Sequence, residues 1–368
     1  MIAVVFNTLY ALLLLTYLYG WRKSFLISVE PAATGDLPFV SVIIPVRDEA
    51  MNIEFIFRSL IEQNYPTEKC EWIFVDDHSV DTTVEWLIRQ KDQRCKFFSL
   101  KSDQTGKKAA LKAGVEMAKG EWILTTDADC TLPSDWIMSM VSYGWRNDAM
   151  MVCGLVKVEE DQKVVTAFQS METGVLQFSG VGSLAMGRPL LNTGASLAFR
   201  KSAWEEVQGY QSNEHVASGD DTFLMLSFDK HFPGKVLPLV AHAATVSTRG
   251  MKTMKEVLYQ RLRWNGKVKH YPPGYIHGVG ILVMTAALSF LFSFFQLISG
   301  FTTIQCFLSV LLLRFIPEMI ILIEWKKLTT QRFSLISMLT MSIFYPLFTV
   351  FSLLIRPFVS NLWKGRKL

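Results

Sequence analysis

Cysteine is sparse in this chain of 368 residues and is never paired in sequence. The five cysteines stand singly, with no CxxC spacing and an odd total: Cys70, Cys95, Cys130, Cys153 and Cys306. Structural zinc sites and disulfide frameworks are built from closely spaced or even-numbered cysteines, so neither is indicated. Scattered thiols of this kind are typical of a protein in a reducing compartment.

Strong net charge and a glycine-rich phosphate loop are also missing. The formal net charge is only +4, and no basic run with interleaved aromatic residues occurs, so nucleic acid is not an expected partner. The pattern GxxxxGK[ST] is absent, which excludes the phosphate cradle of P-loop ATPases. Any phosphate group bound by this chain must therefore be held by a metal ion and basic side chains.

Charged residues are absent from the first 21 positions, whereas hydrophobic residues fill them. At about 1.5 Å per residue, a helix over 1–21 crosses a hydrocarbon core of about 30 Å. A cleaved signal peptide is the alternative, but it has its positive charge before the apolar run, and here Arg22 and Lys23 follow it. We predict an uncleaved transmembrane helix, with the N-terminus outside and the next domain in the cytoplasm.

No Asp, Glu, Lys or Arg occurs from position 270 to position 313, which is long enough for two crossings. We expect transmembrane helices at 274–298 and 303–323. Arg314 and Glu318 lie four residues apart in this apolar zone, where they form a self-neutralising pair or, alternatively, a lipid-headgroup site.

A third apolar run covers 333–355 and precedes a basic tail at 356–368. A full third crossing would place this basic tail outside, against the positive-inside rule. The segment is therefore predicted to be either transmembrane or re-entrant, and we favour a re-entrant path that is broken midway by Pro346.

The middle of the chain, 38–270, alternates short β-rich runs with amphipathic stretches. This alternation predicts an α/β domain with a mostly parallel sheet and helices on both faces. The expected strands are 39–46, 70–77, 95–100 and 120–129, and the expected helices begin near Asn52, Thr82 and Lys107.

Polar residues gather where three of these strands end, in "PVRDEA" (45–50), "VDDHS" (75–79) and "TTDADC" (125–130). An Asp after a strand is often only a helix N-cap. Because ligands of open α/β sheets bind outside the carboxyl ends of the strands, three such clusters in register predict one binding crevice.

The "DAD" at 127–129 is the most chemically suggestive of these clusters. Alternate carboxylates at a strand end suit Mg²⁺ or Mn²⁺, and such an ion would neutralise a diphosphate leaving group. Lys108, in "GKKAAL", precedes a helix and is a candidate phosphate ligand, with a solvated helix start as the alternative.

Two further motifs lie closer to the apolar C-terminal part. Asp220 and Asp221 in "SGDD" open a helical run, where they are N-caps or place a general base; we favour the base. "QRLRW" (260–264) lies just before the membrane segments. An interfacial helix with snorkelling arginines and a belt tryptophan explains that position.

Taken in order, "PVRDEA", "VDDHS", "GKKAAL", "TTDADC", "SGDD" and "QRLRW" resemble the motifs of family 2 glycosyltransferases. These are inverting enzymes of the GT-A fold, a Rossmann-like α/β fold that binds nucleotide-diphospho-sugars. The resemblance covers about 38–270 and is closest to membrane-bound bacterial members. Cellulose, chitin and hyaluronan synthases and ceramide glucosyltransferases share the motif set.

The resemblance assigns roles to the donor side of the site. Pro45, Arg47 and Glu49 would line the nucleotide pocket, and Asp76 and Asp77 would bind the uracil and ribose end.

The remaining roles concern the metal, the base and the acceptor. Asp127 and Asp129 correspond to the DxD motif, with Asp129 as the direct metal ligand, and Asp221 to the catalytic base. Asp220 stands where the family usually has Glu, which leaves its supporting role open. The family's QxxRW motif, which closes over the diphosphate and forms part of the acceptor site, corresponds to Gln260, Arg263 and Trp264.

The expected function is therefore that of a multi-pass glycosyltransferase of the cell inner membrane with a cytoplasmic catalytic domain. It would move a sugar from a nucleotide-sugar donor, a UDP-hexose, to a lipid-linked or glycolipid acceptor at the cytoplasmic membrane face. A processive polysaccharide synthase is the enzymatic alternative, although four apolar segments are few for a polymer channel. A membrane scaffold with a degenerate domain is the non-enzymatic alternative. The sequence indicates neither the sugar nor the oligomeric state.

Overall fold

The computed structural model describes residues 1–368 except 26–36, 162, 211–218, 357–361, 364–365 and 368. These residues form two compact units. The α/β unit comprises Lys23–Val158 and Leu191–Arg249, and the helical unit comprises Met1–Arg22, Glu159–Leu190 and Gly250–Leu368. The range 38–270, expected to be one domain, thus contributes to both units. The basic tail expected at 356–368 falls largely outside the described residues.

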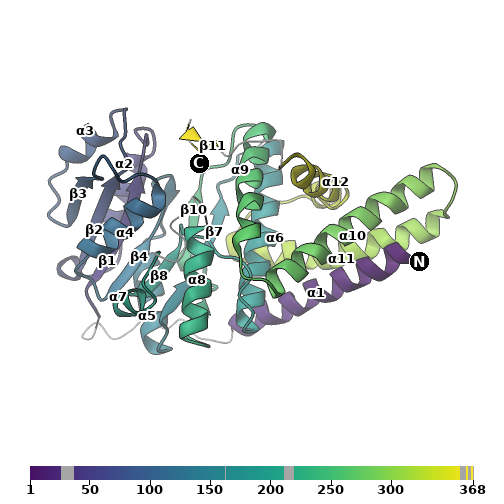
Figure 1. Ribbon diagram of the computed structural model, residues 1–368, viewed down its shortest axis with the longest axis horizontal. Coiled ribbons are helices and arrows are strands. Elements are labelled where there is room, and N and C mark those ends of the chain that lie inside the picture. Colours follow the sequence, from purple (N-terminus) through teal and green to yellow (C-terminus); the bar gives the residue numbers. More distant parts are fainter. Residues whose placement is uncertain (26–36, 162, 211–218, 357–361, 364–365, 368) are drawn as a thin grey trace. The chain divides into compact units, whose positions relative to one another are not determined.

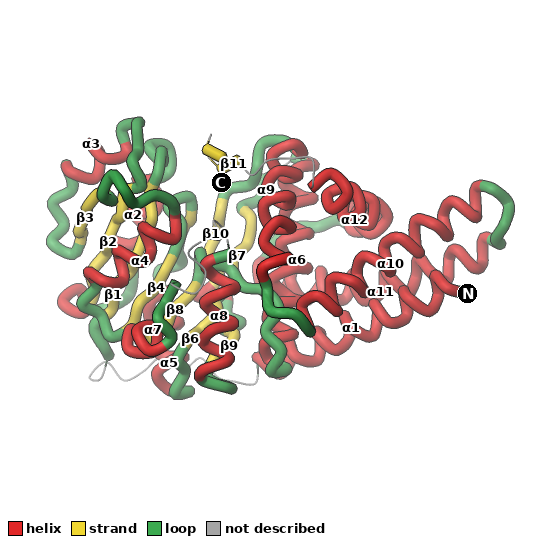
Figure 2. The backbone as a smooth tube through the Cα atoms, viewed as in Figure 1, coloured by secondary structure: helices red, strands yellow, loops and turns green. Residues whose placement is uncertain are grey.

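The α/β unit contains a seven-stranded sheet in the order β3-β2-β1-β4-β8-β6-β9 (Figures 1 and 2). Strands β3, β2, β1 and β4 are parallel, whereas β8 is antiparallel to both of its neighbours. The strands are β1 Val40–Val46, β2 Cys70–Asp76, β3 Cys95–Ser99, β4 Trp122–Thr125, β6 Met151–Cys153, β8 Leu197–Arg200 and β9 Val236–Pro238. A second sheet pairs β5 Cys130–Thr131, β10 Thr245–Thr248 and β7 Leu155–Val158.

The helices of this unit connect the strands as the sequence predicts. They are α2 Ile53–Ile61, α3 Thr83–Ile88, α4 Lys107–Met117, α5 Trp136–Arg146, α7 Lys201–Glu206 and α8 Asp220–His231, with short 3-10 helices at Thr67–Lys69 and His242–Ala244. The predicted strands at 39–46, 70–77 and 95–100 and the three predicted helix starts are confirmed to within about a residue. The strand expected at 120–129 ends at Thr125, so the DxD residues lie in the turn that follows it.

The central strands are continuous apolar runs in the sequence because both of their faces are buried in the core. β1 and β2 are covered on both faces, and Val42, Trp72 and Phe74 have no exposed surface. Helix α4 packs closely on β1, since a Cβ added at Gly114 would lie 2.4 Å from Cγ2 of Ile43.

The register of the sheet determines where the loops meet. Val46 pairs with Asp76, and Asp76 pairs with Ser99, so β1, β2 and β3 end at one edge of the sheet. Thr125, the last residue of β4, pairs with Leu197, the first residue of the antiparallel β8. The loop that leads into β8 therefore reaches the same end of the sheet as the turn after β4.

In the residues that the structure describes, the helical unit is built from six main helices. They are α1 Ile2–Ser24, α6 Val164–Ala185, α9 Met254–Lys267, α10 Tyr275–Ile298, α11 Ile304–Thr329 and α12 Leu335–Ile355, with a 3-10 helix at Val268–His270 and two short tail strands, β11 Leu362–Trp363 and β12 Arg366–Lys367. By length and composition, α1, α10, α11 and α12 are able to cross a membrane. They coincide closely with the four predicted apolar segments.

Helix α6, which no sequence pattern predicts, packs against two of these apolar helices. A Cβ added at Gly182 would lie 2.3 Å from the carbonyl oxygen of Tyr17, and one at Gly174 would lie 2.7 Å from Cδ1 of Trp325. Small residues allow such close helix contacts in membrane proteins. This packing explains why 159–190 belongs to the helical unit.

Helix α12 continues through Pro346, so the break predicted there is wrong. In transmembrane helices, neighbouring helices, Ser or Thr side chains, water or local backbone adjustment satisfy the carbonyl that a proline leaves without a donor, so such a helix can continue. In Figures 1 and 2, α1, α10 and α11 lie side by side, whereas α12 is seen nearly end-on and thus runs crosswise to them. That 333–355 is transmembrane or re-entrant stays a prediction.

Arg314 and Glu318 form the pair expected from their spacing, 3.3 Å apart, within the apolar helices. Glu318 also accepts hydrogen bonds from the hydroxyls of Tyr10, at 2.9 Å, and Ser342, at 2.5 Å, and Arg314 donates to Asn7 at 3.2 Å. The charges are thus neutralised inside the protein, where they join α1, α11 and α12.

Candidate functional site

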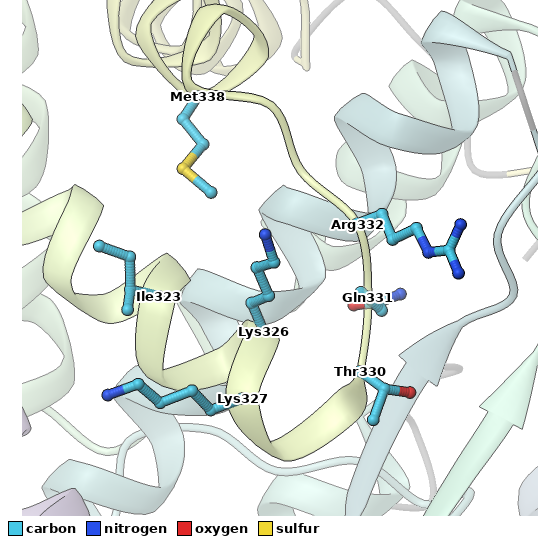
Figure 3. A pocket seen from close by; sticks show the side chains of 7 residues that line it. All are labelled: Ile323, Lys326, Lys327, Thr330, Gln331, Arg332 and Met338. Carbon is cyan, nitrogen blue, oxygen red and sulfur yellow. The ribbon is translucent and has the colours of Figure 1, made fainter.

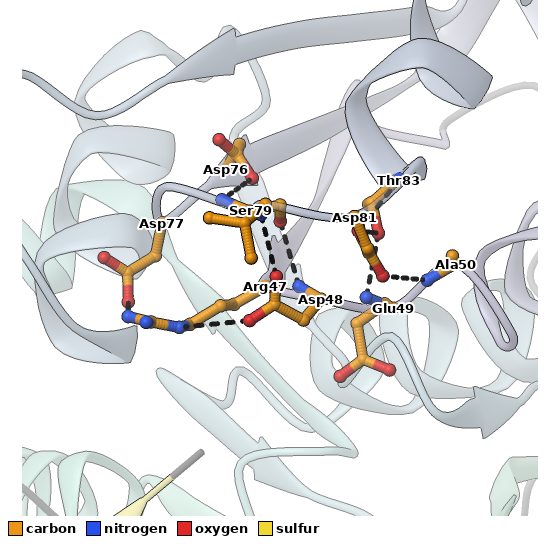
Figure 4. A network of polar contacts seen from close by, with 10 residues as sticks. Arg47, Asp48, Glu49, Ala50, Asp76, Asp77, Ser79, Asp81 and Thr83 are labelled. Carbon is orange, nitrogen blue, oxygen red and sulfur yellow. Dashed lines mark hydrogen bonds and ion pairs between the residues drawn. The ribbon is translucent and has the colours of Figure 1, made fainter. Parts of the chain in front are cut away.

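A buried ion pair links the loops that follow β1 and β2. The Arg47 Nη1 lies 3.2 Å from Oδ2 of Asp77, and its Nε lies 3.6 Å from the Asp48 carboxylate (Figure 4). Arg47 is 8% exposed and Asp77 is 2% exposed. At such depth an unpaired charge is costly, so this pair fixes the position of both loops.

Hydrogen bonds between side chains and backbone also hold the loops after β1 and β2. Asp76 accepts from the backbone N–H of Ser79 at 3.1 Å, and the Ser79 hydroxyl accepts from the N–H of Asp48 at 2.9 Å (Figure 4). The Glu49 carboxylate accepts from the side chain of Asn52 at 2.7 Å. The predicted donor-side residues therefore gather at one sheet edge, together with the half-buried Pro45 of β1.

A lysine lies among three carboxylates, which belong to the turn after β4 and to the start of α8. Lys107, the first residue of α4, places its Nζ 2.5 Å from Oδ1 of Asp127. Burial by itself lowers the pKa of Lys107, but the charges of Asp127, Asp220 and Asp221 outweigh it and raise that pKa above its usual value. The Lys107 side chain is thus held as an ammonium ion.

The Asp221 carboxylate is fixed by two backbone donors. Its Oδ2 accepts from the N–H of Gly194 at 3.1 Å, and its Oδ1 accepts from the N–H of Thr222 at 2.6 Å. The carbonyl of Gly194 in turn accepts from the hydroxyl of Thr125 at 2.8 Å, which ties the loop before β8 to the end of β4. Backbone donors of this kind favour the ionised carboxylate.

Gly194 faces the same space as the charged residues. A Cβ added there would lie 3.5 Å from Cβ of Asp221, 3.7 Å from Oδ2 of Asp220 and 3.7 Å from Nζ of Lys107. One loop, the start of α8 and the start of α4 therefore surround a common volume.

Two carboxylates of this region have the oxygen donors that a hard cation prefers. Asp127 and Asp129 flank a tight turn, in which the N–H of Cys130 donates to the carbonyl of Asp127 at 3.1 Å. Within the described part of the chain, no three His, Cys, Asp or Glu side chains are grouped so as to hold a metal ion. A Mg²⁺ or Mn²⁺ ion here would therefore need further oxygen ligands from a substrate or from water.

The structure thus brings Asp127, Asp220 and Asp221 together around Lys107, which was not among the residues predicted from the sequence. The predicted phosphate ligand was Lys108, the next residue of α4. Both lysines follow Gly106 at the start of the helix, so the sequence marks the position but does not distinguish the two side chains. Ser218 of the "SGDD" motif lies outside the described residues.

The QRLRW residues belong to the helical unit, on α9. This helix begins after Thr253, whose hydroxyl accepts from the N–H of Glu256 at 3.2 Å, as an N-cap does. Gln260 accepts from the side chain of Gln169 at 3.1 Å. Arg263 is half-buried and makes no ion pair with any residue that the structure describes.

Arg261, which the motif does not specify, is the anchored arginine of α9. It forms an ion pair with Glu172 of α6 and donates a hydrogen bond to Tyr345 of α12. Its guanidinium also lies 5.8 Å from the ring centre of Trp264. Glu172 is 2% exposed, so Arg261 neutralises a carboxylate that would otherwise be buried alone.

Comparison with known proteins identifies relatives. Residues 41–206 match the sequence model of Glycosyl transferase family 2. Glycosyltransferase AglE of Haloferax volcanii is 37% identical over 111 residues, which are 30% of this chain and 36% of AglE. Beta-monoglucosyldiacylglycerol synthase of Trichormus variabilis is 25% identical over 249 residues, which are 62% of this chain and 49% of that enzyme. The chain thus spans about half or less of the length of these relatives.

Among solved structures, the chain is similar to the mannosyltransferase PcManGT from Pyrobaculum calidifontis, determined in complex with GDP-Man and Mn²⁺. The TM-score is 0.59 at 20% identity, over 94% of this chain and 98% of that one. This similarity and the mixed sheet confirm the predicted GT-A type of α/β fold. The family match runs from β1 to α7, so this part of the chain is similar to glycosyl transferase family 2.

Proposed function

We propose that this protein is a membrane-bound, inverting glycosyltransferase. It transfers a sugar from a nucleotide-sugar donor, a UDP-hexose, to a lipid-linked or glycolipid acceptor at the cytoplasmic face of the membrane. The observation that carries the proposal is the fixed Asp221 carboxylate, which accepts the N–H of Gly194 at 3.1 Å beside the Lys107–Asp127 pair.

Asp221 acts as the general base. Its carboxylate takes the proton of an acceptor hydroxyl while the hydroxyl oxygen forms a bond to the anomeric carbon of the sugar. The bond from that carbon to the diphosphate breaks on the opposite face, with its electron pair leaving on the nucleoside diphosphate. A single displacement of this kind inverts the anomeric configuration. The two backbone donors orient Asp221 for this step.

The departing diphosphate needs positive charge. Lys107 supplies a permanent ammonium ion, and Asp127 and Asp129 offer the hard oxygens for Mg²⁺ or Mn²⁺. When bound, a divalent cation neutralises charge on the leaving group. The Mn²⁺ in the mannosyltransferase complex supports this assignment. Arg263 is assigned to the same diphosphate by the QxxRW resemblance.

Other residues are assigned to binding. The nucleotide is proposed to lie at the edge that contains Arg47, Asp76 and Asp77, with Pro45 and Glu49 as further donor-side residues. The phosphate role is proposed for Lys107 in place of its neighbour Lys108. Gln260 and Trp264 are assigned to the acceptor, and Asp220 to support of the base.

The membrane helices favour a lipid acceptor. Four helices are long and apolar enough to span a bilayer, so the enzyme meets lipids that diffuse in the same plane. The name of the Trichormus relative, a beta-monoglucosyldiacylglycerol synthase, supports a glycolipid product.

The test is a donor screen with the purified full chain, membrane lipid extract and a panel of nucleotide sugars. We expect a lipid whose mass rises by one hexose and whose formation stops when a chelator removes divalent cations. Asp221→Asn should lower turnover by roughly 10²- to 10⁴-fold with donor affinity nearly unchanged. A near wild-type rate in this variant would refute the base assignment, and long polymer products would favour the processive alternative.

A further inference from the structure

A basic pocket of about 520 Å³ lies at the junction of α11 and α12, in the helical unit. Its cationic lining consists of Lys326 and Lys327, in the last turn of α11, and Arg332, in the loop before α12. Ile323 and Met338 form apolar walls. Figure 3 shows the Lys326 side chain rising into the space between Ile323, Met338 and Arg332.

The positive charge of this pocket is only partly neutralised. Glu324 lies 3.4 Å from Lys327 and 3.6 Å from Arg22 of α1, so it serves two cations. Glu160 accepts the backbone N–H of Arg332. The Lys326 ammonium and the Arg332 guanidinium form no ion pair with residues in the described ranges.

Lysines at the end of a transmembrane helix have ordinary explanations. They complement the helix dipole and follow the positive-inside rule. Neither explanation accounts for Arg332, which lies beyond the helix, or for a pocket that combines cations with apolar walls. These features fit an amphiphile with an anionic head.

The loop that forms the pocket is held in place from both sides. Gln331 is 3% exposed; its amide oxygen accepts from the indole of Trp325 at 2.9 Å, and its amide nitrogen donates to Ser170 of α6 at 2.6 Å. Thr330 caps α11 in the left-handed conformation, with its N–H bonded to the carbonyl of Lys326 at 2.9 Å. A ligand would therefore meet a preformed pocket.

A pocket at the charged end of a membrane-spanning α11 would lie at the depth of lipid headgroups. It is at the charged end of an apolar helix, and the Arg22–Glu324 contact places it level with the end of α1. At this level basic pockets between membrane helices meet phospholipid phosphates, while apolar walls contact the acyl chains.

We propose that this pocket binds the phosphate headgroup of an anionic phospholipid, with Lys326 and Arg332 as its cationic ligands and with Ile323 and Met338 beside its acyl chains. The proposal does not rest on the transferase reaction, since lipid binding is measured without substrate.

The experiment uses the purified full chain in neutral detergent, titrated with phosphatidylglycerol or phosphatidylcholine, and counts retained lipids by native mass spectrometry. We expect preferential retention of phosphatidylglycerol. The variant Lys326→Gln/Arg332→Gln should bind it on the order of 10- to 30-fold more weakly, from about 1 kcal/mol for each basic residue at a membrane surface. Lys252→Gln/Lys255→Gln removes two exposed charges elsewhere in the same unit and should bind as the wild type does.

A second variant separates a shaped site from diffuse attraction. Ile323→Trp keeps every charge but fills part of the pocket, so it should also weaken phosphatidylglycerol retention several-fold. Wild-type retention in Ile323→Trp, or equal losses in both double variants, would overturn the proposal. Displacement of the lipid by excess inorganic phosphate would likewise overturn it, because the pocket would then be a site for free phosphate.

Discussion

The Nζ of Lys107 lies 2.5 Å from Oδ1 of Asp127, so the start of α4 is joined to the turn that carries the DxD residues. Its ammonium is the cation of the carboxylate cluster. Lys107→Met should therefore lower kcat/KM by roughly 10²- to 10³-fold, the range for loss of one charge-stabilising donor in an active site. Steady-state kinetics with the donor found in the screen would measure this.

Lys108→Met is the matched control, since it removes the same charge one residue further along α4. We expect kcat/KM of this variant to stay within a few-fold of wild type. If Lys108→Met is the more damaging change, the phosphate role predicted from the sequence belongs to Lys108, and the assignment of Lys107 to the diphosphate is wrong.

Substitution of Gly194 tests whether the substrate occupies the space between Asp221 and Lys107. The added methyl of Gly194→Ala would lie at ordinary contact distances, 3.5 Å from Cβ of Asp221 and 3.7 Å from Nζ of Lys107. The fold should tolerate it, but the rate should fall on the order of 10-fold because the methyl group occupies space in which the substrate is proposed to lie. Gly278→Ala, where an added Cβ meets nothing within 4 Å, is the control and should retain full activity. An unchanged rate in Gly194→Ala would place the substrate elsewhere.

Much of the α/β unit could be predicted from the sequence because its information is local. The apolar runs of β1 and β2 and the polar residues at their ends mark the strands and the edge of the sheet that carries the site. Local patterns could not distinguish Lys107 from Lys108, because two adjacent lysines differ only in the direction of their side chains.

The helical unit was harder to predict because its key contacts join distant residues. Arg261 and Glu172 are 89 positions apart, and Arg261 and Tyr345 are 84 apart. Helix α6 gave little signal, since its small residues, such as Gly174 and Gly182, fit against α11 and α1 rather than forming a clear apolar stripe.

From the hydrogen bonds of the Glu71 carboxylate we predict that the α/β unit loses stability in acid. Burial alone raises the pKa of Glu71, but hydrogen bonds from Lys96, Ser41 and the N–H of Lys119 outweigh burial and leave it below its usual 4.5. A lowered pKa means that the stabilisation is present above pH 4.5 and is lost as the pH falls through the folded-state value.

Thermal unfolding of wild type and Glu71→Gln should therefore differ most near neutral pH, by about 2 kcal/mol, and converge in acid. Glu85→Gln, at an exposed i,i+4 pair with Arg89, should change stability by less than about 0.5 kcal/mol at any pH. A difference between wild type and Glu71→Gln that stays constant from neutral pH into acid would contradict the stabilising role of the ionised carboxylate.

The two arginines of QRLRW should separate stability from activity. Arg261 neutralises the buried Glu172, so Arg261→Met should destabilise the protein by about 3–5 kcal/mol. Arg263 has no ion pair among the described residues, so Arg263→Gln should change the free energy of unfolding by no more than about 0.5 kcal/mol. The same variant should lose transferase activity. Unfolding of the detergent-solubilised chain and the transfer assay measure the two effects.

The double variant Arg261→Met/Glu172→Met then tests the cause. Because it removes both charges, it should recover much of the stability lost in Arg261→Met alone, as buried ion pairs replaced by apolar groups often do. If the double variant is as unstable as the single one, the packing of Arg261 against Tyr345 and Trp264, rather than charge neutralisation, holds α9 in place.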